Sequence, residues 1–244
     1  MNGRVTLATA QRVFHQLRRD HRTVALVFLV PPLLLALFRY VFDGQPETFD
    51  RVGGPLVGIF PFVMMFVVTS VTMLRERTTG TLERLMTLPL SKLDLLGGYA
   101  LAFAILAALQ AAVTSAVAFG LLGLDVEGSV LVVVALAVCN ALLGMALGLF
   151  ASAFAQSEFQ AVQFMPAFVL PQFLLCGLLV PRERMAELLE WISYALPLTW
   201  ADAGLQRAVD GGDATLIARD AAIVLAVTLL ALGLAAATLR RRTP

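Results

Sequence analysis

The stretch Arg75–Asp94, RERTTGTLERLMTLPLSKLD, separates two long apolar runs, and the interpretation of the whole chain depends on it. Its charged residues make it too polar for the hydrocarbon core of a membrane. Gly80 interrupts the stretch, and a short helix is expected to begin near Glu83 and to end at Pro89 and Ser91. A short structured helix between two apolar runs indicates a surface on which another protein docks.

The composition is that of an integral membrane protein. Of the 244 residues, 59% are hydrophobic and 14% are charged, whereas a soluble domain carries about 25% charged residues. The net charge of +1 does not point to a partner, and no nucleic acid is expected. Cys139 and Cys176 lie inside apolar runs, which indicates packing residues rather than a disulfide. His15 and His21 have no cluster of ligand residues at metal-binding spacing, so no metal site is expected.

Six apolar runs are long enough to cross a bilayer, which takes about 20 residues. The sequence therefore predicts one all-α integral membrane domain over residues 1–244, with six transmembrane helices. The predicted spans are Val24–Phe42, Pro55–Leu74, Leu95–Leu122, Ser129–Phe154, Ala161–Val180 and Ala221–Leu239.

An amphipathic helix is predicted before the first span, within residues 1–22, and is expected to lie at the membrane interface with its arginines toward anionic lipid. The alternative is a basic topology signal and nothing more. The apolar face is predicted from Leu7, Ala10, Phe14 and Leu17.

The basic residues predict the orientation of the chain. With a cytoplasmic N-terminus, the inner segments hold the arginines of residues 1–22, the basic residues of 75–94 and Arg240–Arg242, and the outer segments hold fewer basic residues. The positive-inside rule then predicts that both termini and segment 75–94 are cytoplasmic. Segment 181–220 is predicted to lie outside.

Segment 181–220 is predicted to form a short outer helical hairpin before the last span. Its first helix carries an apolar stripe that has to be buried against protein or lipid, and Pro197 ends that helix. A second helix is predicted over Trp200–Val209. The hairpin is either a gate between two copies of the chain, re-entrant in the membrane, or a linker resting on its surface. The stripe consists of Met185, Leu188, Leu189, Ile192 and Leu196.

Motifs for catalysis are missing from the sequence. It contains no G-x-x-x-x-G-K-[ST], no H-E-x-x-H and no G-x-S-x-G, so it is not expected to be an enzyme or to hold its own ATP site. Arg39 is the one ionisable residue within a predicted span. Proton-driven transport, which usually needs an intramembrane carboxylate, is therefore disfavoured, although backbone carbonyls of broken helices could still hold sodium. A membrane assembly subunit without transport activity stays an alternative.

Three stretches carry a family resemblance. Leu74–Ser91, LRERTTGTLERLMTLPLS, is similar to a cytoplasmic segment written E-R-E-x-G-T-L-E-x-L with a proline and a serine after it, except that Thr78 and Thr79 replace its Glu/Lys-rich middle. Leu170–Met185, LPQFLLCGLLVPRERM, is similar to a fifth span that ends in a glycine and an outer proline. Leu196–Val209, LPLTWADAGLQRAV, is similar to a P-L-T-x-x-x-x-x-x-R element, with seven residues rather than six between Thr199 and Arg207. In this order, with six spans, they resemble the permease of type-2 ATP-binding-cassette exporters, which include drug-resistance and polysaccharide-export permeases.

The resemblance implies three groups of functional residues. Coupling to a nucleotide-binding subunit is expected at Glu76, Arg77, Gly80, Thr81, Glu83, Leu85, Pro89 and Ser91. An outer gate is expected at Gly177, Pro181, Leu189, Pro197, Leu198 and Thr199. Candidate residues lining a transport path, with packing as the alternative role, are Phe62, Phe66, Gln163, Phe164 and Phe168.

The resemblance also implies the partners. A second permease copy or paralogue and two nucleotide-binding ATPase subunits are expected, which would bind ATP and Mg, while this chain would bind no cofactor and contact membrane lipids. The location implied is the cytoplasmic membrane of a bacterium. The expected substrate is a hydrophobic drug-like molecule or lipid moved out of the cell, because the path-facing spans are rich in phenylalanine and methionine. The alternative substrate is a lipid-linked glycan or polysaccharide.

Overall fold

The computed structural model describes residues 3–81, Arg84 and 91–238, and within them every regular element is a helix. The predicted all-α fold is confirmed. The helices are α1 (Gly3–Arg19), α2 (His21–Val41), α3 (Pro46–Thr78), α5 (Lys92–Gly120), α6 (Val130–Ala151), α7 (Glu158–Leu175), the 3-10 helix η1 (Arg182–Arg184), α8 (Glu187–Tyr194), α9 (Pro197–Val209) and α10 (Ala214–Thr238).

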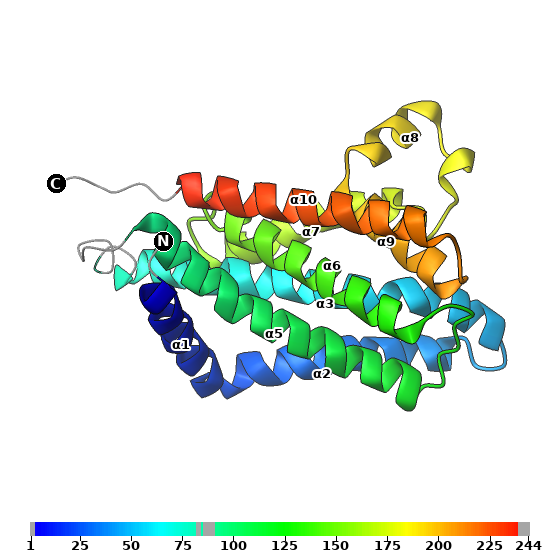
Figure 1. The fold of residues 1–244 in the computed structure, drawn as a ribbon, viewed down its shortest axis with the longest axis horizontal. Helices are drawn as coiled ribbons and strands as arrows, with labels where there is room; N and C mark the ends of the chain where they lie inside the picture. The colour runs from blue at the N-terminus through cyan, green and yellow to red at the C-terminus, as the bar shows by residue number, and fades with distance from the viewer. Residues whose placement is uncertain (1–2, 82–83, 85–90, 239–244) are drawn as a thin grey trace.

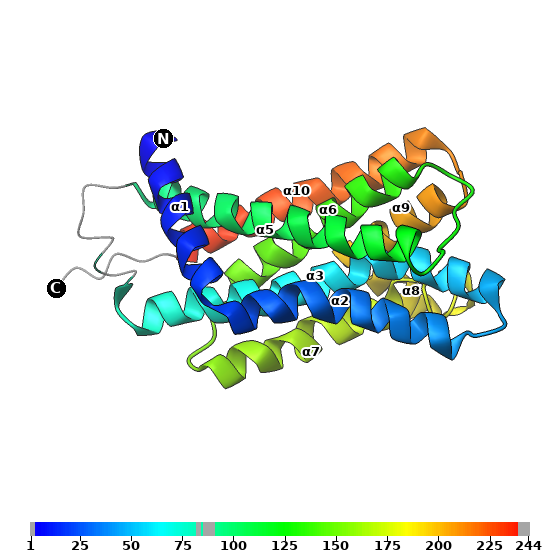
Figure 2. The ribbon, with the colours of Figure 1, turned by 90° about the horizontal axis from the view of Figure 1, so that it is seen from below.

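The long helices run up and down in alternation. Figures 1 and 2 show α2, α3, α5, α6, α7 and α10 each running from one end of the bundle to the other, with the direction reversed at each connection. Five helices among the described residues are long and apolar enough to cross a membrane, and they correspond to five of the predicted spans. The remaining predicted span, 161–180, corresponds to α7, which has 18 residues, contains Pro166 and Pro171, and ends at Leu175.

The bundle has two distinct ends. At the first, which we call the α1 end, α1 lies across the bundle and packs mainly on α5, close to where α3 ends and α10 finishes (Figure 1). At the opposite end, which we call the α8 end, lie α8, α9 and the connections 42–45 and 121–129. Helix α1 and the last turn of α10 therefore lie at the same end of the bundle.

The centre of the bundle is the contact between α3 and α6, the most extensive of the fold. Gly144 and Gly148 lie one turn apart on α6, and a Cβ atom on either would overlap a backbone carbonyl oxygen of α3, at Phe62 and Phe66 respectively. The two backbones are therefore in direct contact, as the G-x-x-x-G spacing predicts. Phe62, Met65 and Phe66 are at most 1% exposed and fill the space beside this contact.

The predicted N-terminal helix is present as α1, but the side chains that it buries differ in part from the predicted apolar face. Ala10 and Leu17 are buried as expected, whereas Leu7 is 54% exposed and Thr9 and Val13 are buried in its place. The reason is the tertiary partner. A side chain at Gly98 of α5 would overlap Thr9, so the two helices approach closely along the Thr9–Val13 side.

The segment between α7 and α10 contains two α-helices, as predicted, with different bounds. Helix α9 begins at Pro197 rather than Trp200, because a proline at the first helical position needs no amide hydrogen-bond partner. Helix α8 stands away from the bundle (Figure 1), and its main contacts are with η1, α9 and α7. Within one chain its predicted apolar stripe is not covered: Leu188, Leu189 and Ile192 are 71%, 41% and 43% exposed.

Candidate functional site

The coupling segment begins as the last turn of α3. The apolar run was expected to end at Leu74, but the helix continues to Thr78, and the amide of Thr79 still bonds to the carbonyl of Arg75 at 3.0 Å. Gly80 then has a φ of +72°, which a residue with a side chain rarely adopts. Gly80 therefore ends the helix as a C-terminal glycine cap.

Glu76 joins three helices at the α1 end. Its side chain is buried, and its Oε1 accepts a hydrogen bond from Gln16 Nε2 of α1 at 3.1 Å. Arg12 of α1 lies 3.6 Å from Glu76 Oε2 and donates a hydrogen bond to the hydroxyl of Tyr99 on α5, whose ring lies under the guanidinium at 5.5 Å. Because Glu76 and Arg12 are charged and Glu76 is buried, these contacts hold α1, α3 and α5 in one arrangement.

Arg75 connects the same turn of α3 to α7 and α2. Its Nε and Nη2 donate to the two carboxylate oxygens of Glu158, at 2.7 and 2.9 Å, and its Nη1 lies 3.8 Å from Asp20 Oδ2. Asp20 caps α2 by accepting hydrogen bonds from the hydroxyl and the amide of Thr23, at 2.7 and 3.1 Å. These bonds lower the pKa of Asp20, and the nearby Arg75 charge lowers it further. Asp20 is thus a carboxylate near neutral pH.

A shallow cavity of about 380 Å³ lies between these contacts. It opens beside the turn at which α3 ends, so it is next to the segment predicted to dock a partner. Its lining residues come from α1, the start of α2 and the end of α3: Val13, Gln16, Leu17, Asp20, Thr23, Thr72, Arg75, Glu76, Thr79 and Thr81.

The predicted coupling residues do not all lie on a surface. Glu76 is 7% exposed and bonds to Gln16 of α1, so its side chain is buried within the single chain. Its role in coupling stays a prediction. Arg77 is half-buried, Gly80 lies in the turn after α3, and Thr81 is the first helical residue after that turn. Ser91 caps α5 by accepting a hydrogen bond from the amide of Asp94 at 3.0 Å. The other predicted members, Glu83, Leu85 and Pro89, lie outside the described residues.

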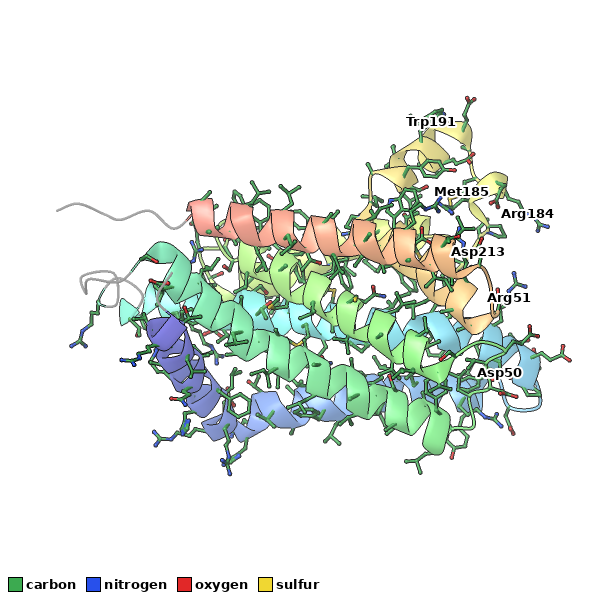
Figure 3. All side chains as sticks on the ribbon, in the orientation of Figure 1. Asp50, Arg51, Arg184, Met185, Trp191 and Asp213 are labelled. Carbon is green, nitrogen blue, oxygen red and sulfur yellow. The ribbon has the colours of Figure 1, made fainter. Side chains whose placement is uncertain are left out.

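The α8 end contains a larger cavity of about 1170 Å³. Figure 3 shows two of its charged residues, Asp50 and Arg51, where α3 begins, and a third, Arg184, below α8. The first part of the lining, from α3 and the α5–α6 connection, is Glu47, Thr48, Asp50, Arg51, Val52, Asp125, Val126 and Glu127. The second part, from residues 176–184 and α9, is Cys176, Gly177, Leu178, Leu179, Pro181, Arg182, Glu183, Arg184, Asp202, Ala203, Gln206, Arg207, Val209 and Asp210.

Asp202 of α9 is a buried carboxylate that lines this cavity. It is 1% exposed, and its Oδ2 accepts a hydrogen bond from Gln206 Nε2 at 2.7 Å. Among the described residues nothing donates a hydrogen bond to its Oδ1. Helix α9 is not one of the helices long enough to span the membrane, and burial raises the pKa of Asp202 to about 7 although the charge of Arg182 acts in the opposite direction. Asp202 therefore changes charge near neutral pH.

A second buried carboxylate, Asp220 of α10, is fully paired. It is 0% exposed and forms ion pairs with Arg207 of α9 and, at 3.0 Å, with Arg219. Sequence reasoning singled out Arg207 only as a motif residue and placed Asp220 at the edge of the last outer segment. The sequence could have predicted this pairing, because an acidic residue directly before an apolar run needs a cationic partner. The pairing fastens α9 to the last long helix.

The predicted gate residues lie at different depths. Leu198 and Thr199 at the start of α9 are 0% exposed, whereas Pro181 and Leu189 are exposed. Pro197 is the first residue of α9, and Gly177, beside Asp202, has a φ of +114°. Gln172 of α7 supports the start of α9, because its Oε1 accepts a hydrogen bond from the amide of Leu198 at 3.4 Å.

Two of the predicted path-lining residues are internal. Phe62 and Phe66 are buried by the α3–α6 contact, so within one chain they line no surface and fill the core. The members on α7 are at the surface: Phe168 is 48% exposed, Gln163 is exposed and Phe164 is half-buried. The rings of Phe164 and Phe168 meet edge to face with centroids 6.0 Å apart. Helix α7 therefore offers an apolar surface that one chain does not cover.

Comparison with known proteins gives the family. The chain is 27% identical over 160 residues to ABC transporter G family member 20 of Dictyostelium discoideum, which covers 65% of this chain and 22% of that protein. It is 27% identical over 143 residues to the "Probable multidrug ABC transporter permease YbhR" of Escherichia coli, covering 59% and 39% of the two chains. With YbhS of the same organism, bearing the same description, the identity is 24% over 176 residues, covering 72% and 47%.

The chain thus spans less than half of the length of each of these relatives. The sequence profile of the ABC-2 type transporter family matches residues 4–208, from α1 to the end of α9, and so includes both ends of the bundle described above. By this match, this multi-pass helical membrane chain belongs to the ABC-2 type transporter family.

Proposed function

We propose that the chain is the transmembrane permease subunit of an ATP-driven exporter, and that two separate nucleotide-binding subunits, which bind ATP and Mg, dock at the α1 end. Its family and its likeness to multidrug permeases support transport as the activity. The observation that carries the proposal is the junction at the end of α3. There the turn at Gly80 follows directly on Glu76 and Arg75, which are bonded to neighbouring helices.

The junction suggests how a docked subunit would act on the bundle. A displacement of the segment after Gly80 would reach α3 first, then α1 and α5 through Glu76, and α7 through Arg75. These links are ion pairs and hydrogen bonds to charged groups, which hold their geometry better than neutral contacts. The helices around the junction would therefore move together when the partner closes on ATP, and the chain itself would need no catalytic residue.

The proposed substrate is a hydrophobic drug-like molecule or a lipid, moved between two copies of the chain. The uncovered apolar surface of α7 supports this proposal, since Phe168, Leu170 and Leu174 are 48%, 51% and 55% exposed. Exposed apolar side chains in this number need lipid, a second protein copy or a substrate against them. The second copy would be identical or a paralogue.

The proposed location is the cytoplasmic membrane of a bacterium, with the α1 end in the cytoplasm and the α8 end outside. The arginines of α1 support this orientation, because basic residues favour the cytoplasmic side and attract anionic lipid headgroups. They are Arg4, Arg12, Arg18 and Arg19, with Arg22 following at the start of α2.

ATP-dependent transport in reconstituted vesicles tests the proposal. The chain is reconstituted with the nucleotide-binding subunits that copurify with it, and uptake of a hydrophobic fluorescent dye is followed in inside-out vesicles. Gly80→Pro is expected to abolish ATP-dependent uptake, because the φ of +72° at Gly80 conflicts with the proline value of about −65°. Glu83→Arg, a charge reversal in the coupling segment, is expected to have the same effect.

The matched control is Gly44→Pro, which places the same conflict at a φ of +79° in the connection at the opposite end. This variant is expected to insert and to retain coupled transport, because Gly44 is exposed and distant from the α1 end. If uptake survives both Gly80→Pro and Glu83→Arg, the coupling assignment is wrong. If no ATP-dependent uptake occurs in any sample that contains the nucleotide-binding subunits, export itself is refuted.

A further inference from the structure

We infer that the cavity at the α8 end binds an organic cation, whose positively charged group pairs with the carboxylate of Asp202. The inference rests on the proposed export function and narrows its substrate class to amphipathic molecules with a protonated or quaternary amine. The cavity, the unpaired carboxylate oxygen and the charges around it each support this assignment.

Asp202 is positioned as a ligand-binding group rather than as a structural one. It lines the cavity, it is 1% exposed, and one of its oxygens is held by Gln206. Its other oxygen, Oδ1, receives no hydrogen bond from the part of the chain that the structure describes. A buried acceptor without a donor destabilises the fold, and more so when it is charged. An ammonium group entering the cavity would remove that destabilisation.

Asp220, a second fully buried carboxylate at this end, differs from Asp202 because its charge is neutralised by ion pairs within the chain. Both of its oxygens are engaged, one by Arg207 and one by Arg219. Asp202 has a nearby arginine too, Arg182, but no ion pair within 4.0 Å joins these two described residues. The guanidinium of Arg182 lies over the ring of Tyr194 instead, at 5.2 Å from its centroid. Arg182 therefore does not neutralise Asp202 through a direct ion pair, and Oδ1 is a buried acceptor that lacks a donor among the described residues.

The remaining charges favour a cation over an anion. More carboxylates than arginines line the cavity, and Arg207 is already neutralised by Asp220, which lies outside the lining. A cleft lined mainly by one sign of charge focuses its field and concentrates ions of the opposite sign. The acidic lining residues are Glu47, Asp50, Asp125, Glu127, Glu183, Asp202 and Asp210, and the basic ones are Arg51, Arg182, Arg184 and Arg207.

The size and apolar part of the cavity fit an organic molecule. A volume of about 1170 Å³ is slightly above the range of about 300–1,000 Å³ that drug-sized ligands occupy. Leu178, Leu179 and Val209 supply apolar lining beside the carboxylate. A bare divalent metal fits the site less well, because it needs about six oxygen ligands, and the described residues contain no group of three metal-ligating side chains.

Equilibrium binding to the purified chain tests the inference without any partner subunit. The chain is held in detergent at about pH 8, where Asp202 is ionised, and is titrated with ethidium as the cationic probe and N-phenyl-1-naphthylamine as the neutral one. Asp202→Asn is expected to raise the Kd of ethidium by about tenfold or more, the effect of losing one charge-assisted contact. The Kd of the neutral probe is expected to change by less than about twofold.

Arg182→Gln gives a second test with the opposite sign. Removing this positive charge while leaving Asp202 in place is expected to lower the Kd of ethidium by about threefold or more, which loss of a purely structural residue would not do. Glu187→Gln is the matched control, since Glu187 is an exposed carboxylate of α8 at the same end of the bundle that does not line the cavity, and it is expected to shift the Kd by less than about twofold.

The inference is overturned by unchanged ethidium affinity in folded Asp202→Asn, or by weaker ethidium binding in Arg182→Gln. Equal loss of both probes in Asp202→Asn would also overturn it, since that result indicates general damage to the cavity. If Asp202→Asn does not fold, the Arg182→Gln result decides. Because binding needs no ATP, a chain that binds ethidium through Asp202 yet shows no ATP-dependent transport would refute the export proposal and leave the cation site standing.

Discussion

Replacing Asp202 by asparagine is expected to stabilise the chain at alkaline pH and to leave its stability nearly unchanged in acid. The side chain is 1% exposed, and when it is ionised its Oδ1 carries charge that the described residues do not neutralise by a hydrogen bond. Burial therefore raises the pKa of Asp202 from its ordinary 3.8 to about 7, against the opposing effect of the Arg182 charge. Asparagine has nearly the same shape and cannot ionise.

The sign of the effect follows from proton linkage. Between pH 3.8 and about 7 the folded chain keeps a proton on Asp202 that the unfolded chain has released, so the free energy of unfolding falls as the pH rises through this window. Below the window both states are protonated and the penalty is absent; above it the penalty is constant. A difference of about three pKa units corresponds to about 4 kcal/mol at most, and this is the cost that Asp202→Asn would remove.

Thermal unfolding in detergent measures this effect. Cys139 and Cys176 are partly and fully buried, so a fluorogenic thiol reagent that reacts only after unfolding reports the transition. The Tm of Asp202→Asn minus that of the natural chain is expected to be close to zero at about pH 4 and to reach about 5 °C or more at about pH 8. The exposed carboxylate of Asp210 provides the control: Asp210→Asn is expected to show no such change between the two pH values.

The reasoning is refuted if the Tm difference for Asp202→Asn is the same at both pH values. A lower Tm than that of the natural chain at about pH 8 would refute it equally, because it would mean that ionised Asp202 stabilises the fold. Since Cys176 lies close to Asp202 and reports on its surroundings, the fluorescence of Trp191 and Trp200 gives an independent reading of the same transition.

Four further changes test other parts of the structure. Gly148→Leu is expected to lower the free energy of unfolding by about 3 kcal/mol in thermal melts, because the α3 backbone leaves no space for a side chain. Tyr99→Phe, which removes a hydroxyl bonded to α1, is expected to cost about 1 kcal/mol in the same assay. Single cysteines at Glu187 and Asp213, in a background without native cysteines, are expected to react with an impermeant reagent on intact cells, and labelling only after permeabilisation would reverse the orientation. Leu189→Asp is expected to leave the Tm of the isolated chain unchanged, since the residue is 41% exposed, but to reduce dimer yield or export, and normal values of both would contradict the gate.

The long helices were predictable because an apolar run of about 20 residues has few structural alternatives in a membrane. Their ends were less predictable, since hydropathy marks where the chain leaves the lipid rather than where its helix stops. The second predicted span was placed up to Leu74, whereas α3 runs one further turn to Thr78. Arginine and glutamate are good helix formers, so nothing breaks the helix before Gly80.

The functional contacts were harder to predict because they join residues far apart in sequence. Glu76 lies within a polar segment, and local pattern alone assigns it to the surface. Its partners, Arg12 and Gln16, lie 64 and 60 positions earlier in a helix that crosses the end of the bundle. The burial of Asp202 likewise depends on how α9 packs among other elements. A short polar helix between spans is consistent with an exposed position as well as a buried one.

The α3–α6 contact also determines how the chain can deform. The backbone of α6 contacts that of α3 at Gly144 and Gly148, so the two helices cannot slide past each other without collision. They therefore move as one rigid unit. With 33 residues, α3 is about 50 Å long, and it carries Arg75 near one tip and Asp50 near the other. A small tilt imposed at the first tip therefore becomes a displacement of the cavity wall at the second. Shape change in such a chain would occur by rocking about the α3–α6 pair.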